Sequence, residues 1–353
     1  MSELIKESVA ILISYKNKIY LLLNMMNLSS VFVTFFIVCT VALDRRILHG
    51  SFFQPALSVT WGKAGFEAEF KYMAKLQMDH VIWQWTVDSK NKVAWYPTSL
   101  KGYKQVTNYD AVEASLIEAA RNNMTVWIGL NDNSDWWKYY ARDENWLKGE
   151  FAIGKSIVKD MWEKYGKKYA IAIAGFYVVF EMDNVNFFPE VEQKRMAAVY
   201  KDIADYTHSL TMRPIMIAPF FNANYVGRKM DAKEYAKLWH DVLLVANIDI
   251  IAMQDGVGVE HCKLVEVTNW FYQMRLAMAS ARPGSQLWSD LETFEMENAT
   301  KLRPAPISRV LQQIQLEYPY VSRITSFSFN HYDSPQQGFT KQYEEYLKYV
   351  QDH

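Results

Sequence analysis

Two apolar runs of this chain end in carboxylates, and these acids are the residues best suited to carry chemistry. The first run is Gly175–Asp183, in which Glu181 directly follows a stretch of apolar residues. The second is Gln286–Glu295, which contains Glu292. A strand that is apolar on both faces is typical of a covered parallel sheet, and such folds keep their catalytic groups at the C-terminal tips of the strands. Two carboxylates on different strands are the groups needed to hydrolyse a glycosidic bond.

The elements that would position these acids form a repeating pattern after residue 47. Eight short apolar runs occur, at Leu48–Pro55, His80–Val87, Met124–Leu130, Ile173–Phe180, Pro214–Phe221, Ile248–Met253, Gln286–Leu291 and Ile324–Phe329. Helix-like amphipathic segments lie between them, at Ala64–Gln77, Ala111–Asn122, Asn145–Tyr165, Glu190–Ser209, Ala232–Ala246, Cys262–Ala279 and Ser308–Glu317. This alternation predicts an α/β fold, a (β/α)8 barrel, over residues 47–353.

A doubly wound open sheet is the alternative architecture for the same alternation. No glycine-rich phosphate loop follows an early strand, and a count of eight runs fits a closed barrel. No Pro- or Ser-rich linker interrupts the region, so we expect a single domain.

In a barrel, the residues at the C-terminal tips of all eight strands share one mouth. We therefore predict that substrate contacts come from the polar and aromatic residues at these tips, namely Gln54, Gln84, Trp85, Asn131, Asp183, Asn222, Gln254, Asp290 and Tyr332. Amides, carboxylates and aromatic rings with almost no cations suit a neutral, hydroxyl-rich ligand. A phosphorylated substrate would require Arg, Lys or a phosphate-binding loop at this end.

Polar residues at strand tips have a second interpretation, because Asn and Asp also form turns and cap helices. Glu181 is different, since Glu is not a preferred turn residue. On the second run, Asp290 and Glu295 compete with Glu292 for the second catalytic role. Asp255 either caps the turn that follows it or joins the site as an alternative catalytic partner.

Aromatic residues are abundant, with 12 Trp, 22 Tyr and 19 Phe. Aromatic faces can stack on sugar rings, but they also fill cores. The pair Trp136 and Trp137 after the third strand is accordingly interpreted either as loop packing or as a sugar platform.

Composition excludes several other classes of function. The net charge is −1 and no basic block is present, which argues against a nucleic-acid partner. The two cysteines, Cys39 and Cys262, cannot form a disulfide framework within the main domain. Of the histidines, His331 alone sits well at a strand tip, so we predict neither a catalytic metal nor a cofactor. No Gly-x-Ser-x-Gly motif supports serine hydrolase chemistry.

Residues 1–46 form a separate N-terminal segment, which we interpret as a signal peptide or membrane anchor. The apolar run Val31–Leu43 suits the core of a signal peptide, and Thr40–Ala42 offers a cleavage site. Joined to the apolar run Ile19–Met26, it could instead span a membrane as an uncleaved anchor. We expect export to the periplasm or cell surface with membrane association through this segment; a cytoplasmic protein is the alternative.

Several segments of the chain resemble a known family. Gly50–Pro55, Val81–Thr86, Gly175–Asp183, Ile250–Gly258 and Trp288–Glu295 are similar to motifs of a bacterial family of uncharacterised TIM-barrel proteins related to glycoside hydrolases. The resemblance covers nearly all of the chain after residue 47. It implies a barrel fold and a carbohydrate ligand.

A looser similarity links the chain to the clan of retaining barrel glycosidases. That clan has an acid/base Glu after strand 4 and a nucleophilic Glu after strand 7, and Glu181 and Glu292 occupy these places. The chain departs from the clan in having Phe180, not Asn, before the strand-4 Glu. We predict an exported glycoside hydrolase in which Glu181 is the general acid and Glu292 the nucleophile or base. The alternative is a non-catalytic carbohydrate-binding barrel at the cell surface.

Overall fold

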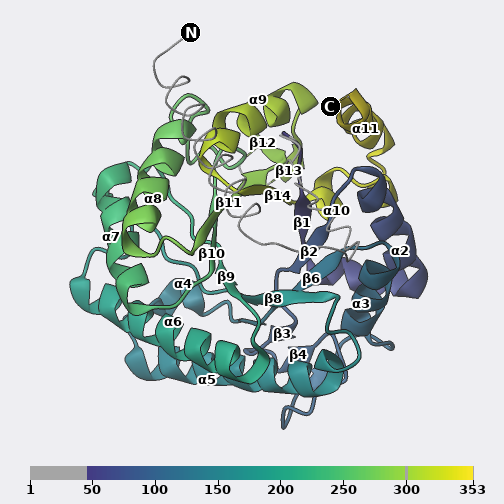
Figure 1. The fold of residues 1–353 in the computed structure, drawn as a ribbon, viewed down its shortest axis with the longest axis horizontal. Helices are drawn as coiled ribbons and strands as arrows, with labels where there is room; N and C mark the ends of the chain where they lie inside the picture. Colours follow the sequence, from purple (N-terminus) through teal and green to yellow (C-terminus); the bar gives the residue numbers. More distant parts are fainter. Residues whose placement is uncertain (1–45, 299–300, 353) are drawn as a thin grey trace, which may run out of the picture. The chain divides into compact units, whose positions relative to one another are not determined.

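Eight parallel strands close into a barrel in the described part of the chain, residues 46–298 and 301–352 of a computed structural model (Figure 1). The strands are β1 (Gly50–Phe53), β2 (His80–Trp83), β6 (Thr125–Gly129), β8 (Ile173–Val178), β9 (Ile215–Ile217), β10 (Ile250–Gln254), β11 (Gln286–Glu292) and β14 (Arg323–Phe327). They pair in this order, and β14 pairs with β1 to close the ring. The predicted (β/α)8 barrel, with its eight strands, is confirmed.

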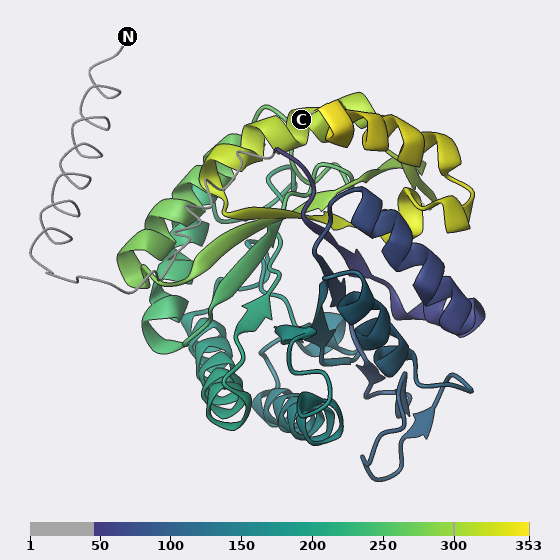
Figure 2. The ribbon, with the colours of Figure 1, turned by 45° about the vertical axis from the view of Figure 1, so that its right-hand side comes forward.

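A helix follows each barrel strand and lies on the outside of the ring (Figures 1 and 2). These helices are α2 (Pro55–Lys75), α3 (Ala111–Arg121), α5 (Glu144–Met161), α6 (Glu190–Thr211), α7 (Ala232–Val245), α8 (Val267–Ala281), α9 (Ile307–Glu317) and α11 (Thr340–Asp352). The last helix packs beside the first, where the rings of Tyr72 and Tyr343 meet edge to face at 5.2 Å. The described residues therefore form one compact unit.

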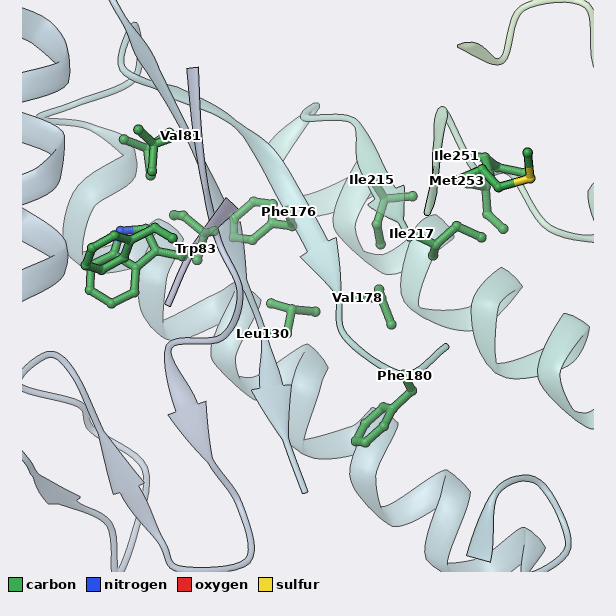
Figure 3. Packing of buried hydrophobic residues seen from close by; sticks show 14 of the residues in the cluster. Val81, Trp83, Leu130, Phe176, Val178, Phe180, Ile215, Ile217, Ile251 and Met253 are labelled. Atoms are coloured by element: carbon green, nitrogen blue, oxygen red, sulfur yellow. The ribbon is translucent and has the colours of Figure 1, made fainter. Parts of the chain in front are cut away.

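The alternation of side chains along each strand builds two apolar layers. Outward-facing residues such as Phe176 and Val178 on β8, with Ile251 and Met253 on β10, pack against the helices (Figure 3). Inward-facing residues such as Tyr177 join a smaller cluster inside the barrel. Because both faces of the sheet are covered, the strands read as continuous apolar runs.

Smaller elements lie at the C-terminal ends of the barrel strands. A hairpin of β12 (Phe294–Asn298) and β13 (Lys301–Pro304) follows β11. A four-stranded sheet combines β3 (Val87–Asp88), β4 (Val93–Ala94), β5 (Lys104–Gln105) and β7 (Asn131–Asp132). The short helices are α4 (Trp136–Tyr139) and α10 (Phe329–Tyr332). A π-helix covers Trp162–Gly166, and 3-10 turns cover Tyr318–Tyr320 and Pro335–Gln337.

Two helix starts differ from the sequence prediction. Helix α2 begins at Pro55 rather than Ala64, because proline is well suited to the first helical position, and it bends at Gly62, whose φ is +60°. Helix α8 begins at Val267 rather than Cys262, so His261 and Cys262 lie in the β10–α8 loop.

The predicted signal or anchor segment lies outside the described residues, apart from Arg46. Among the helices that the structure describes, none combines the length and apolarity needed to cross a bilayer.

Candidate functional site

A cavity of about 360 Å³ opens at the C-terminal end of the barrel. It is lined by residues from several strands and loops: Phe52, Gln84, Trp137, Tyr177, Glu181, Phe220, Gln254, Gly256, Val259, His261, Asp290, Glu292, Phe294, Leu302 and Phe327. Glu181 and Glu292, the two acids singled out in the sequence, both line it. They come from the tips of the fourth and seventh barrel strands.

Glu181 reaches the cavity because the alternation of β8 continues past its end. Phe180 turns outward onto Trp136, with ring centroids 5.3 Å apart, while Glu181 turns inward. Two tyrosine hydroxyls fix the backbone on either side. Tyr200 on α6 donates to the carbonyl of Phe180 at 2.7 Å, and Tyr235 on α7 donates to that of Met182 at 3.0 Å. The position of Glu181 is therefore set by the helices behind the strand.

The environment of Glu181 favours its protonated form. Removal from water raises the pKa of this carboxyl to about 8, against a hydrogen bond from the Gln254 amide that lowers it. Gln254 is itself oriented by donating to the carbonyl of Ala218 at 2.8 Å. A carboxylic acid with a raised pKa is the form that protonates a leaving group.

Glu292 faces the cavity through the alternation of β11, where Leu287 and Leu291 point outward to the helices. Its Oε2 accepts a hydrogen bond from the backbone N–H of Val259 at 2.8 Å, and a second comes from the N–H of Gly258. Burial and then the neighbouring Asp255 raise the pKa of Glu292 to about 8, while these backbone donors oppose the rise.

Gly258 permits this close seating of Glu292. A Cβ at position 258 would collide with the backbone oxygen of Phe294 and lie 2.9 Å from Oε2 of Glu292. The loop after β10 therefore acts as a cradle for the carboxylate of β11. In the sequence, the glycine-containing segment Asp255–Gly258 was the feature that could indicate this close contact.

Asp255 lies behind the cavity wall and is not among the lining residues. It is fully buried, and its Oδ1 accepts from the backbone N–H of Val257 at 3.1 Å and of Glu292 at 3.3 Å. Its other oxygen accepts from the Gln313 amide on α9. Of the two alternatives raised from the sequence, Asp255 takes the first, because it caps its own turn and does not reach the cavity.

Glu295 and Asp290, the other two candidate acids of this run, lie in different places. Glu295 lies on the β12–β13 hairpin and pairs with Arg303 at 2.6 Å. Asp290 lines the cavity, and its Oδ1 is buried with no hydrogen-bond partner among the described residues. Burial, followed by Glu292, Asp255 and Glu181, raises the pKa of Asp290 well above its usual value. This shift favours the protonated form of Asp290.

Of the predicted substrate contacts, Gln84, Gln254 and Asp290 line the cavity. The other predicted contacts lie outside the cavity lining. Asn131 donates to Glu150 at 2.8 Å, and Asp183 accepts from the backbone N–H groups of Val185 and Asn186, both at 2.7 Å. The remaining residues that do not line the cavity are Gln54, Trp85, Asn222 and Tyr332.

The adjacent tryptophans lie in different environments. Trp136 is 3% exposed and packs among Tyr140, Trp146 and Phe180, whereas Trp137 is 53% exposed and lines the cavity. Sequence reasoning missed several lining residues: Phe52, Tyr177, Phe220, Gly256, Val259, His261, Phe294, Leu302 and Phe327. Strand alternation could have identified Tyr177, since it faces inward between the outward-facing Phe176 and Val178.

Within residues 46–298 and 301–352, no group of three or more His, Cys, Asp or Glu side chains is arranged to hold a metal ion. Burial lowers the pKa of His261, the histidine of the cavity wall.

Its topology and its likeness to solved structures place the molecule among the TIM barrels. The sequence matches, over residues 48–338, the family described as "Domain of unknown function (DUF4434)", and the chain belongs to this family. A comparison with curated proteins finds no match.

Solved structures share the fold. A Bacteroides thetaiotaomicron protein described as a "putative alpha-L-fucosidase" superposes with a TM-score of 0.74 at 21% identity, covering 86% of this chain and 93% of its own. The endo-1,4-β-mannanase of Rhizomucor miehei gives a TM-score of 0.56 at 12% identity, covering 87% and 95%. The endo-β-1,4-mannanase of Thermotoga petrophila gives 0.55 at 10%, covering 87% and 77%.

Proposed function

We propose that this protein is a glycoside hydrolase that acts on an uncharged oligo- or polysaccharide. One observation carries the proposal: Glu181 and Glu292, from the fourth and seventh barrel strands, line the same cavity together with aromatic and amide side chains. Three carboxyl groups and no Lys or Arg occur among the described lining residues. An anionic sugar would be repelled there whenever one of these acids ionises.

The two glutamates take different roles. Protonated Glu181 donates its proton to the oxygen of the leaving sugar as the glycosidic bond breaks. Glu292 acts in its ionised form, which becomes populated as the pH rises toward its pKa of about 8, and it either attacks the anomeric carbon or removes a proton from an attacking water. The hydrogen bonds from Gly258 and Val259 hold its carboxylate in place and stabilise the charged form. Gln84, Gln254 and Asp290 offer hydrogen bonds to sugar hydroxyls.

Single replacement of Glu181 and Glu292 by Gln tests the assignment. The substrates are neutral oligosaccharides and aryl glycosides, beginning with α-L-fucosides and β-1,4-linked mannooligosaccharides, because the structural neighbours are named for these linkages. Each variant should lose on the order of a thousandfold in kcat. Glu295→Gln is the matched control, since Glu295 pairs with Arg303 outside the cavity, and it should keep its activity. Undiminished hydrolysis by both Glu181→Gln and Glu292→Gln would refute the proposal.

The stereochemistry of the product separates the two roles of Glu292. An NMR spectrum recorded before the freed sugar mutarotates identifies its first anomer. Retention means that Glu292 is the nucleophile, and inversion means that it activates water.

A further inference from the structure

Three neighbouring rings line the open side of the cavity, and the proposed chemistry gives them no role. They are Trp137 of α4, Phe220 of the β9–α7 loop and His261 of the β10–α8 loop, and we call them the ring strip. The ring centroids of Trp137 and Phe220 are 6.0 Å apart. Those of Phe220 and His261 are 6.3 Å apart. The three side chains therefore adjoin one another along the cavity wall.

The ring strip is accessible, in contrast to the aromatic rings deeper in the cavity. Trp137 is 53% exposed, and Phe220 and His261 are half-buried. Phe52 and Tyr177, which line the same cavity from inside the barrel, are buried. The cavity thus has a deep part closed by buried rings and an outer part bordered by accessible rings.

The order of the barrel strands places the ring strip beside Glu181. Strands β6, β8, β9 and β10 are consecutive neighbours in the barrel. The residues that follow these strands are, in the same order, Trp137, Glu181, Phe220 and His261. Trp137 and Phe220 therefore come from the two strands that flank β8, on either side of Glu181. Glu292 lies further round the mouth, at the tip of β11.

Hydrogen bonds fix the ring strip relative to the segment that carries the acid. The Tyr235 hydroxyl lies 2.8 Å from the carbonyl oxygen of Phe220 and 3.0 Å from that of Met182, the residue after the acid. The backbone N–H of Asn224 donates to the carbonyl of His261 at 3.0 Å, which joins the β9–α7 loop to the β10–α8 loop. The rings and the acid are therefore held by one connected set of loops.

The position of the general acid decides where the leaving sugar must lie. When the glycosidic C–O bond breaks, its electron pair goes to the leaving oxygen, which takes the proton of Glu181. The leaving group must therefore lie beside Glu181, where the ring strip forms the accessible apolar surface. The C–H face of a pyranose ring is flat and apolar, and it can stack on aromatic rings of this kind.

We propose that the ring strip of Trp137, Phe220 and His261 is the binding site for the leaving sugar, and that the enzyme cleaves bonds between two sugar residues. This inference rests on the proposed function, in which Glu181 is the general acid. The substrate is then a glycan whose leaving unit is a pyranose with an accessible C–H face.

Substrates that share the cleaved sugar and differ in the leaving group test this inference. β-1,4-Mannobiose is compared with β-mannosyl fluoride, and an α-L-fucosyl disaccharide with α-L-fucosyl fluoride, because fluoride leaves without occupying a sugar site. In Trp137→Ala and in Phe220→Ala, the ratio of kcat/KM for the disaccharide to kcat/KM for the fluoride should fall about fivefold. Trp137→Phe keeps an aromatic ring and should restore most of this ratio. Tyr272→Ala is the matched control, since Tyr272 is 45% exposed on α8 outside the cavity lining, and its ratio should equal that of the wild type.

The comparison separates failure of this inference from failure of the proposed function. An unchanged ratio in both Trp137→Ala and Phe220→Ala, with hydrolysis still dependent on Glu181, would overturn the inference alone. A fall seen only with the phenyl glycoside of the same sugar would also overturn it, because the rings would then bind an aromatic leaving group. Absence of hydrolysis of every substrate by the wild type would contradict both. Because the ratio is taken within each variant, a loss of folded protein cancels from it.

Discussion

At the residue scale, local hydrogen bonds compete with the cavity for the polar side chains at the strand tips. Asp183 is short and bonds the backbone of its own turn, as expected for Asp in turns. Glu181, two residues earlier, is longer and lines the cavity. Gln84 and Gln254 likewise reach it, whereas Asn131 bonds to Glu150. The sequence could identify polar strand tips, but the competition between local turns and the cavity depends on the folded backbone.

The adjacent tryptophans permit a residue-scale prediction. Replacing Trp137 with Ala should raise KM for the hydrolysed glycan about fivefold, because an exposed ring available for sugar stacking is removed and about 1 kcal/mol of contact is lost. Stability should change little, since 53% of Trp137 is exposed. Steady-state kinetics and thermal unfolding measure the two effects.

Trp136→Ala is the comparison variant. Its ring is buried among other aromatic rings, so truncation should reduce the free energy of unfolding by about 3–5 kcal/mol. A large loss of stability in Trp137→Ala, with KM unchanged, would contradict the division of roles between the two residues.

At the element scale, the barrel was predictable because each strand is covered on both faces and therefore appears as an apolar run. The loops were not. The β10–α8 loop supplies Gly256, Val259 and His261 to the cavity wall, although the sequence predicted a helix from Cys262. Cys262 is buried although it lies in a loop that folds against β11. Its apolar side chain therefore fitted the pattern of a helix in the sequence. The β12–β13 hairpin was also missed, although Phe294–Glu297 and Lys301–Arg303 alternate apolar and charged residues.

The loop after β10 makes a testable contribution as an element. Gly258→Ala should push the loop away from Glu292, because the added Cβ meets the backbone of Phe294. Misplacing a catalytic group by about 1 Å costs on the order of a hundredfold in rate, so kcat should fall by roughly this factor. Gly284→Ala, in the α8–β11 loop where an added Cβ meets no neighbouring atom, should leave kcat unchanged. Equal kcat values for Gly258→Ala and the wild type would exclude the cradle.

At the scale of the whole molecule, buried acids make stability depend on pH. Burial raises the pKa of Glu69 and Asp333 to about 7 and that of Glu181 and Glu292 to about 8. Their ordinary values are 4.5 for Glu and 3.8 for Asp. The folded state therefore holds protons that the unfolded chain has already released, and ionising these groups inside the fold costs free energy.

The sign of the effect follows from linkage. A group whose folded-state pKa is raised contributes stability that is complete below its unfolded pKa and is lost as the pH rises through the folded value. The midpoint temperature of thermal unfolding should therefore decrease as the pH rises from 6 to 9. His49, whose pKa burial lowers to about 4, acts in the opposite direction, mainly below pH 6.5. Glu292→Gln removes one ionising group and should lose less stability over this interval than the wild type, while Glu295→Gln should match the wild type. Calorimetry at pH 6 and pH 9 measures the midpoint temperature of unfolding. A midpoint temperature that is equal or higher at pH 9 would mean that these carboxyls are already ionised in the folded protein. Glu181 would then not be available as an acid.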